Sequence, residues 1–290
     1  MLAPMTVPAE NKVILITGTS SEHGLGYATA RLLASRGHIV YATVRNIATA
    51  ADIVNGTSPG RITIRTLDLL DRSAMNPLLA DIKRTEGRLD AVINNAGYGV
   101  IGGVEQVDLD VARTSFETNV WGTMALVQEA LPLMRDQRHG HLVLVSSCFV
   151  AGLPVMAMGY YLGAKAALET LFYSLAVEAA PFGVRVTCFQ PGPIMTDLER
   201  VWGDRIPPGG DPRPRLSDEL YAYVSTAAPT AQQPGEAAVA LADVVASADP
   251  PPAAPSGKAS LAYVARALRD PTRSAEITEL LSVIDAPPEC

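Results

Sequence analysis

The chain has 290 residues, enough for one large α/β domain with a sizeable core. Hydrophobic residues make up 48% and charged residues 18% of it, a balance typical of a compact globular protein and not of a disordered one. The formal net charge of −7 at pH 7 gives no general attraction to nucleic acid or anionic membrane, so we expect neither as a partner.

The three cysteines, Cys148, Cys188 and Cys290, lie far apart and form no C-x-x-C pair. This spacing disfavours a zinc site or a disulfide framework, and it predicts a reduced, cytoplasmic setting with no metal. The first ten residues, MLAPMTVPAE, have neither a basic start nor a long apolar core and do not read as a signal peptide. The apolar stretch 142–168 contains Ser, Gly, Pro and Lys, which predicts strand, loop and helix and not a membrane span.

Short apolar runs alternate with helical patterns from residue 12 to about 190. The segment KVILIT predicts a first strand, and GLGYATARLLASRG predicts a helix that ends at Gly37. Further strands are predicted at 38–44, 61–69, 90–97, 140–147 and 184–191. Strands rich in Val and Ile on both faces are typical of a parallel sheet covered by helices on each side. We therefore expect a single-domain, doubly wound, Rossmann-like α/β fold.

Two stretches rich in Pro and Gly interrupt this alternation. Residues 203–217 follow the last clear strand, and we expect the surrounding residues 199–235 to form a lid over the substrate. Residues 248–257 are predicted to be a loop, and the next segment, KASLAYVARAL, fits strand and helix equally well. One domain is thus expected over 1–290, with its core at 12–198. Residues 236–290 would complete the sheet, cover the pocket or contact another subunit.

Tyr161 and Lys165 are four residues apart in GYYLGAKAALETLFYSLAVEAA, which has a helical pattern. Positions i and i+4 share one helix face, so the phenol and the ammonium can converge on one substrate. A cation about 4 Å from a phenolate at an intermediate dielectric contributes roughly 4 kcal/mol, or about three pKa units. The spacing therefore predicts that Lys165 lowers the pKa of Tyr161 toward neutrality, where proton transfer is efficient. Taken alone, it is more simply a surface lysine beside an aromatic residue.

Four further motifs supply the context for this pair. LDAVINNAG (89–97), FETNVWGT, VLVSS, YLGAK and QPGPIMT follow one another in this order. Together they resemble the short-chain dehydrogenase/reductase family over about residues 12–198. The segments YATVRN and VEQVDLDVARTSFETNVWGTMALVQEALPLMR are most similar to the branch that contains the 17β-hydroxysteroid and retinol dehydrogenases. One such motif is weak, whereas five in the family's order are strong.

The resemblance implies four catalytic residues. Tyr161 would be the acid when a carbonyl is reduced and the base when an alcohol is oxidised. Lys165 would lower the pKa of Tyr161 and bind the nicotinamide ribose. Ser147 would hold the substrate oxygen, and Asn119 would support a water that relays the proton. In isolation, Ser147 is more simply a strand-end residue and Asn119 a polar helix residue.

The serine departs from the family's spacing. Members place it thirteen residues before the tyrosine, whereas Ser147 precedes Tyr161 by fourteen. Reading Cys148 or Tyr160 as the functional residue would restore the spacing. We prefer Ser147 because it stands at the family's usual distance from the glycine that opens its strand, and Tyr160 would leave Lys165 off its helical face. The extra residue is expected in the loop FVAGLPVMAMG, where it would change the shape of the pocket.

The glycine-rich turn is also lengthened. The family pattern T-G-x-x-x-G-x-G has three residues between its first two glycines, and here five separate Gly18 from Gly24. The fingerprint G-x-G-x-x-G is not met either, because Thr29 takes its last position. The longer loop costs only about 0.5 kcal/mol of closure entropy. Gly24 and Gly26 still open a helix whose N–H groups favour pyrophosphate, and the family's enoyl reductases bind a dinucleotide with a similar loop. We therefore expect a cofactor site.

The residues around this turn bear on the choice of cofactor. Glu22 would repel a pyrophosphate and is expected to point to solvent, and His23 is expected to be exposed, with a 2′-phosphate contact as the alternative. NAD-specific members carry an acidic residue after the second strand. This chain has Val44 there, followed by Arg45, whose guanidinium can pair with a 2′-phosphate. NADP(H) is therefore preferred, and NAD(H) is the alternative.

Further cofactor contacts follow from the resemblance. Asp68 would contact the adenine, Asn94 and Gly97 would lie near the adenosine ribose, and Ile194 and Thr196 would lie near the nicotinamide carboxamide. The full set of expected cofactor-binding residues is Gly18, Ser20, Ser21, Gly24, Leu25, Gly26, Arg45, Asp68, Leu69, Asn95, Ala96, Gly97, Tyr161, Lys165, Pro191, Gly192, Ile194 and Thr196.

Large side chains are expected around the substrate, although about half of them could pack the core or an interface instead. They are Tyr98, Phe149, Val155, Met156, Met158, Tyr160 and Trp202. A bulky hydrophobic ketone or secondary alcohol fits such a pocket better than a sugar or hydroxy acid. An NADP(H)-dependent ketoreductase, forming a homodimer or homotetramer as its relatives do, is the leading hypothesis. A redox-neutral epimerase or isomerase and a non-catalytic dinucleotide sensor are the alternatives.

Overall fold

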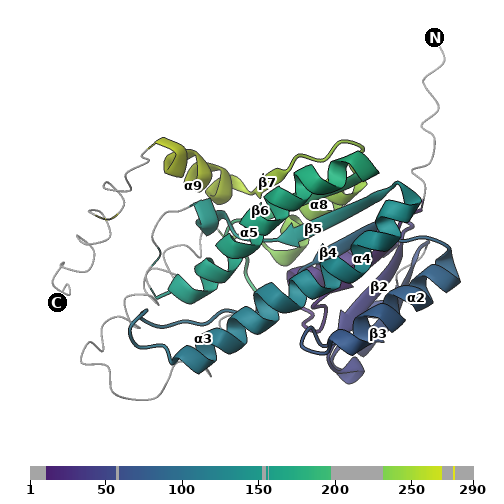
Figure 1. Ribbon diagram of the computed structural model, residues 1–290, viewed down its shortest axis with the longest axis horizontal. Coiled ribbons are helices and arrows are strands. Elements are labelled where there is room, and N and C mark those ends of the chain that lie inside the picture. The colour runs from purple at the N-terminus through teal and green to yellow at the C-terminus, as the bar shows by residue number, and fades with distance from the viewer. Residues whose placement is uncertain are drawn as a thin grey trace, which may run out of the picture.

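A sheet of seven parallel strands runs through the middle of the structure, a computed structural model that describes residues 11–56, 59–151, 155, 157–196, 231–269 and 277 (Figure 1). The strand order is β3-β2-β1-β4-β5-β6-β7. The strands are β1 (Val13–Thr17), β2 (Ile39–Val44), β3 (Arg61–Thr66), β4 (Ala91–Asn94), β5 (Gly140–Val145), β6 (Val184–Pro191) and β7 (Ala253–Ser256). The order reverses between β1 and β4, which makes a switch point where such sheets bind ligands. The predicted single-domain, doubly wound α/β fold is confirmed.

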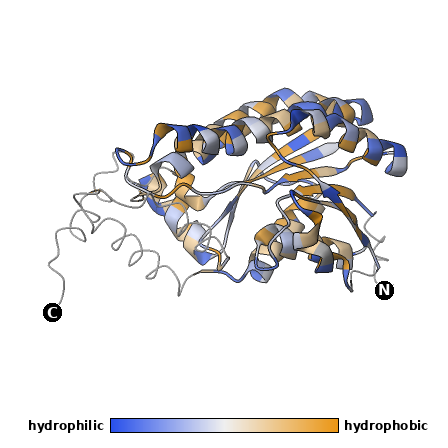
Figure 2. Ribbon diagram, turned by 90° about the horizontal axis from the view of Figure 1, so that it is seen from below, coloured by the Kyte–Doolittle hydropathy of each residue, from blue (hydrophilic) through white to orange (hydrophobic). Residues whose placement is uncertain are grey.

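Helices cover both faces of the sheet. One face packs against α1 (Leu25–Ser35) and α8 (Pro234–Ala246), and the other against α2 (Met75–Glu86), α4 (Thr123–Gln137) and α5 (Gly159–Ala179). Apolar residues concentrate on the strands between these two layers (Figure 2). The remaining helices are the short η1 (Ile47–Val54), η2 (Arg72–Ala74), η4 (Cys148–Ala151) and η5 (Ala180–Phe182), the π-helical η3 (Glu117–Gly122), and α3 (Leu109–Phe116) and α9 (Lys258–Arg269).

The burial of β1 on both faces explains why its sequence is a continuous apolar run. Its side chains alternate between the two faces, so Val13 and Leu15 enter one core and Ile14 and Ile16 enter the other. All four are at most 2% exposed. A strand buried on both faces cannot tolerate the polar alternation of a half-exposed strand, and hence the apolar runs predict the parallel sheet.

The six strands predicted from apolar runs are present as β1 to β6. Most are shorter than their runs, because the last residues of a run leave the sheet to line the site. Residues 95–97 after β4 and 146–147 after β5 are the examples. The predicted helix stop at Gly37 is also present, with a φ of 93° that suits glycine.

The predicted loop at 248–257 is wrong in part, because Ala253–Ser256 form β7. β7 pairs with β6 and, within the described part of the chain, has no second neighbour. An edge strand tolerates proline, so Pro255 needs no partner for the N–H it lacks. The unassigned segment KASLAYVARAL forms the helix α9.

Residues 199–230 of the predicted lid lie outside the described residues, so the lid stays a prediction. From residue 231 on, the described chain completes the fold. Leu241 of α8 is fully buried against α1, and Asp243 accepts a 2.7 Å hydrogen bond from Arg36 at the end of α1. Of the roles left open for 236–290, the described residues complete the sheet through β7.

No helix within the described ranges is both long and apolar enough to cross a bilayer. In the same ranges, no group of three or more His, Cys, Asp and Glu is placed to hold a metal ion. Cys148 and Cys188 are buried free thiols, and Cys290 lies outside the described residues.

Replacing Leu241 tests whether α8 is an integral layer of the fold. We expect Leu241→Ala to lower the free energy of unfolding by about 2–5 kcal/mol, because it leaves a cavity between α8 and α1. Val239→Ala removes an apolar group from the same helix at a site 44% exposed, and should change stability by no more than about 0.5 kcal/mol. Urea unfolding followed by circular dichroism measures both, and equal effects would contradict the assignment.

Candidate active site

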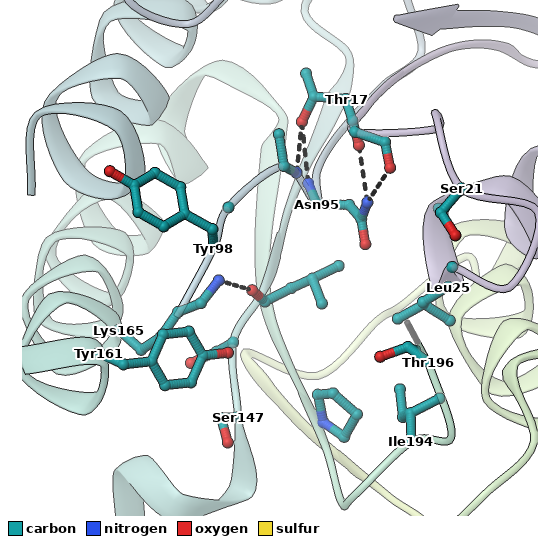
Figure 3. A pocket seen from close by; sticks show the side chains of 18 of the residues that line it. Thr17, Ser21, Leu25, Asn95, Tyr98, Ser147, Tyr161, Lys165, Ile194 and Thr196 are labelled. Carbon is teal, nitrogen blue, oxygen red and sulfur yellow. Dashed lines mark hydrogen bonds between the residues drawn. The ribbon is translucent and has the colours of Figure 1, made fainter. Parts of the chain in front are cut away.

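A cavity of about 510 Å³ lies at the carboxyl ends of β1 to β6, where the strand order reverses (Figure 3). Of the cofactor contacts expected from the sequence, all line it except Asn94. Further lining residues come from the same strand ends and loops: Thr17, Thr43, Val44, Leu67, Leu70, Tyr98, Thr118, Val145, Ser146, Ser147, Phe149, Val155, Met158, Pro193, Met195 and Ala231. The cavity therefore joins the glycine-rich turn to the tyrosine–lysine pair.

The glycine-rich turn keeps its close approach to the β4 end in spite of its extra length. A Cβ on Gly26 would lie 2.5 Å from the carbonyl oxygen of Gly18, and one on Gly18 would lie 2.7 Å from the Cα of Ala96. Gly18 also has a φ of 73°, which favours glycine. Only glycine fits at either position, so the backbone is free to lie against a ligand.

Two residues of the lengthened turn project outward. Glu22 and His23 are both exposed, as expected, and their side chains approach each other to 3.5 Å. The N–H of Gly24 donates to the carbonyl of Ser21 at 2.9 Å and closes the turn before α1 begins. Gly24 is the N-cap of α1 and supplies no side-chain cap. The first N–H groups of α1 thus suit an anion, as the fit to a pyrophosphate requires.

Thr17 and Asn95 join the ends of β1 and β4 beneath the cavity (Figure 3). Thr17 Oγ1 accepts hydrogen bonds from the backbone N–H groups of Asn95 (3.1 Å) and Ala96 (3.0 Å). The Asn95 side chain donates back to the carbonyls of Thr17 and Gly18, both at 2.9 Å. These bonds fix the glycine turn relative to the loop after β4. Thr17 was missed by the sequence analysis; a hydroxyl inside an apolar strand end is the signal that could have found it.

The outer end of the cavity is polar. Arg45 follows β2 and is exposed, and Asp68 and Leu69 follow β3 beside it. One carboxylate oxygen of Asp68 accepts a hydrogen bond from the N–H of Leu70 at 2.9 Å, which holds the carboxylate in a turn. Val44, at the position where NAD-specific members carry an acidic residue, ends β2, and Arg45 directly follows it.

Tyr161, Lys165 and Ser147 lie together on the side of the cavity opposite Ser21 and Leu25 (Figure 3). The Nζ of Lys165 donates to the carbonyl of Val145 at 2.8 Å and lies 5.9 Å from the centre of the Tyr161 ring. Ser147 follows β5, and its Oγ accepts a hydrogen bond from the N–H of Phe149 at 3.3 Å.

The positions of Cys148 and Tyr160 decide whether either could replace Ser147 or Tyr161 in this group. Cys148 is buried and is not among the lining residues, which favours Ser147 over it. Tyr160 does not line the cavity either, because its hydroxyl donates to the carbonyl of Val104 at 3.1 Å. Of the other predicted substrate residues, Tyr98, Phe149, Val155 and Met158 line the cavity, and Met156 and Trp202 lie outside the described residues.

Burial sets the protonation of the tyrosine and the lysine. It raises the pKa of Tyr161 to about 12, and the neighbouring Cys148 adds to the rise. It lowers the pKa of Lys165 to about 8, against the opposing effect of Glu169. The predicted lowering of the Tyr161 pKa is therefore reversed in direction. The reason is that removing the phenolate from water destabilises it by more free energy than a lysine almost 6 Å from the ring supplies by attraction.

Asn119 lies behind the cavity wall and is 1% exposed. Its Oδ1 accepts from the N–H of Tyr98 at 3.0 Å, and its Nδ2 donates to the Tyr98 carbonyl at 2.8 Å and to Ser115 at 3.1 Å. The side chain thus clamps the loop after β4 onto the π-helical segment η3. Asn94 lies below the cavity and donates to the carbonyl of Val143 at 3.3 Å, so Asn95, and not Asn94, faces the site.

The C-terminal helix closes the substrate side. The Phe149 ring meets Tyr263 of α9 edge-on, with ring centres 4.8 Å apart and planes at 86°. The described chain breaks off after Thr196 and resumes at Ala231, and both of these residues line the cavity. The N–H of Gln232 bonds the carbonyl of Pro193 at 2.9 Å, which returns the chain to the sheet edge. Sequence reasoning missed Tyr263, since α9 was not assigned.

The chain matches a family model and is similar to several known proteins. The short chain dehydrogenase family matches residues 12–206. Retinol dehydrogenase 8 of Homo sapiens is 31% identical over 257 residues, which cover 84% of this chain and 80% of that protein. The 3-ketodihydrosphingosine reductase of Bacteroides thetaiotaomicron is 33% identical over 186 residues, covering 64% of this chain and 65% of that protein.

A solved structure has a similar fold. A short-chain dehydrogenase from Streptomyces avermitilis superposes with a TM-score of 0.77 at 29% identity, covering 95% of this chain and 97% of the other. The chain belongs to the short-chain dehydrogenase/reductase family and is an oxidoreductase. The predicted family is confirmed, and the match to retinol dehydrogenase 8 bears out the predicted branch.

Removing the Thr17 hydroxyl tests the junction between β1 and β4. Thr17→Val leaves the N–H of Ala96 without its acceptor, and we expect the free energy of unfolding to fall by about 1–3 kcal/mol. Thr66→Val makes the same change at the exposed end of β3 and should shift it by no more than about 0.5 kcal/mol. Denaturant melts compare the two variants. A Thr17→Val protein as stable as the control would show that the hydroxyl does not hold this junction.

Proposed function

We propose that the protein is an NADP(H)-dependent oxidoreductase that interconverts a bulky hydrophobic ketone and the matching secondary alcohol. One observation carries the proposal: a single cavity contains both a glycine-lined turn at a helix N-terminus and the Tyr161–Lys165–Ser147 group. The cofactor would supply or accept the hydride, and the side chains of the chain would handle the oxygen and its proton.

Several features support NADP(H) as the cofactor. The close backbone approach at Gly18 and Gly26 and the uncapped start of α1 suit a pyrophosphate. Arg45 is exposed at the rim, where its guanidinium can take a 2′-phosphate in a charge-assisted pair. NAD(H) lacks that phosphate and would lose the pair. Asp68 and Leu69 would bind the adenine end, and Pro191, Gly192, Ile194 and Thr196 the nicotinamide end.

Tyr161 would move the proton. With its pKa near 12 it keeps the hydroxyl hydrogen through the neutral range, and it can donate this hydrogen to the oxygen of a carbonyl that is being reduced. Lys165 carries its charge below about pH 8 and would stabilise the phenolate that forms. Ser147 would donate a hydrogen bond to the same substrate oxygen. Asn119 would act through the loop at Tyr98, and its predicted support of a relay water stays a proposal.

The cavity wall supports an apolar substrate. Phe149, Val155 and Met158 pack in one apolar cluster with Tyr161, and Tyr98 lines the same cavity. Two similar proteins are named for retinol and 3-ketodihydrosphingosine, which are both large hydrophobic molecules, and this supports a substrate of that kind. The homo-oligomer, proposed to form through the helices that carry Asn119 and Tyr161, would cover exposed apolar groups such as Trp121 (56%) and Val177 (77%). The cytoplasmic location stays a prediction.

Calorimetric titration with NADPH and with NADH tests the cofactor. We expect tighter binding of NADPH, and a loss of about ten- to a hundredfold in Arg45→Asp, because a charge-assisted hydrogen bond contributes about 1.5–3 kcal/mol. Arg84→Asp makes the same change of charge on α2, away from the cavity, and should leave both affinities unchanged. Tighter binding of NADH would reverse the assignment of Arg45, and a folded protein that binds neither cofactor would remove the proposed enzyme.

Tyr161→Phe tests the proton donor. We expect reduction of a hydrophobic ketone to fall by about 10²- to 10⁴-fold, with NADPH affinity retained as the control. In the wild type the rate should decline as the pH rises through about 8, since Lys165 loses its charge there. One NADPH consumed per alcohol formed would also separate a reductase from an epimerase. A phenylalanine variant as active as the wild type would place the proton donor elsewhere.

A further inference from the structure

We propose that Glu169 is a positioning residue of the site: its buried carboxylate is the counter-charge that keeps the Lys165 ammonium protonated beside Tyr161. The inference rests on the role proposed for Lys165 in the reaction. It concerns a carboxylate that is not among the residues lining the cavity.

The residues follow one another along a single face of α5. Tyr161, Lys165, Glu169 and Tyr173 are spaced four apart, so each lies one turn from the next. Lys165 is 4% exposed and Glu169 is 5% exposed. Charged side chains are rarely buried this deeply in a protein unless they are paired or bound by other polar groups.

Two neighbouring strands hold the two charges. The Nζ of Lys165 donates to the carbonyl of Val145 at the end of β5. Both carboxylate oxygens of Glu169 accept hydrogen bonds from Nε2 of Gln190 in β6, at 3.1 and 3.0 Å. Val145 pairs with Phe189, the residue before Gln190. Adjacent strands are about 4.8 Å apart, so the ammonium and the carboxylate are held over adjoining strands one helical turn apart on α5.

The contacts of Glu169 hold its carboxylate in place. Besides Gln190, the hydroxyl of Tyr173 donates to Oε2 at 3.2 Å. Ser260 of α9 donates to the backbone carbonyl of Gln190 at 2.7 Å and fixes the strand that presents the amide. Both side chains that bind the carboxylate among the described residues are thus hydrogen-bond donors.

The other titratable groups around this pair carry no charge near pH 8. Burial raises the pKa of Tyr161 and of the Cys148 thiol beside it, both to about 12. It also raises the pKa values of Tyr173 and of the Cys188 thiol of β6, which face Glu169. Burial lowers the pKa of Lys165, and the Glu169 carboxylate opposes that fall. Glu169 is therefore the group that balances the lysine.

The lysines of this chain allow a direct test. The sequence contains four, Lys12, Lys83, Lys165 and Lys258. Protein labelled with ¹³C at the lysine ε-carbon therefore gives four signals whose midpoints can be followed from pH 6 to 11, with Lys165→Met assigning one of them. We expect Glu169→Gln to lower the Lys165 midpoint by on the order of one pH unit. The rate of ketone reduction falls with rising pH, and the midpoint of this fall should decrease by the same amount.

Two variants on the same helix serve as controls. Glu178→Gln removes the same charge at an exposed position of α5 and should leave the midpoint of Lys165 within about 0.2 units of the wild type. Glu169→Asp keeps the charge and should restore most of the wild-type midpoint, even if the shorter side chain lowers stability. A purely structural role would lower stability and rate without moving either midpoint.

The outcomes separate this inference from the proposed function. An unchanged Lys165 midpoint in Glu169→Gln overturns the counter-charge, whether or not the protein reduces ketones. A lowered midpoint in a protein without reductase activity supports the counter-charge and contradicts the proposed function. If Glu169→Gln does not fold, the test is made on the wild-type protein instead. Its Glu169 carboxyl ¹³C signal should then show a step at the Lys165 midpoint that Lys165→Met abolishes, and a signal without that step overturns the inference.

Discussion

The hydrogen bonds between Thr17 and Asn95 join the ends of β1 and β4, and the geometry of the site depends on this junction. These strands lie where the sheet reverses its order, so no crossover helix ties their ends together. The Asn95 amide holds the carbonyls of Thr17 and Gly18, which sets the start of the glycine turn. Because Gly26 then lies against that turn, the start of α1 points into the cavity. The lengthened turn keeps this arrangement, and two of its residues, Glu22 and His23, project outward from it.

Burial is the second constraint, and it acts through α5. This helix carries a phenol, an ammonium and a carboxylate into a region packed by Ala164, Leu168 and Phe172. The low exposure makes each charge expensive, so the tyrosine stays protonated and the lysine comes close to losing its proton. A donor phenol beside a lysine that is still charged suits reduction. The same environment would keep a phenolate short-lived unless the lysine and its carboxylate remained charged.

The sequence predicts the elements whose signals are local. Apolar runs predict β1 to β6, and the motifs that line the cavity are contiguous, so their residues were identified together. β7 was missed because Pro255 in a Pro-rich stretch reads as loop, and only its edge position makes that proline acceptable. Tyr160 lies off the cavity because its hydroxyl bonds the carbonyl of Val104, which is distant in sequence, and the contact of Asn119 with Tyr98 is likewise not local. The pKa of Tyr161 depends on burial in three dimensions, which the i, i+4 spacing does not report.

The proposed function requires this one cavity to bring a 2′-phosphorylated dinucleotide and a protonated tyrosine together. The decisive measurement is a crystal structure of the protein with NADP⁺. We expect the 2′-phosphate against the Arg45 guanidinium, the pyrophosphate at the N-terminus of α1, and the nicotinamide ring beside Tyr161 and Lys165. A dinucleotide bound elsewhere, or one whose nicotinamide points away from Tyr161, would overturn the proposed function.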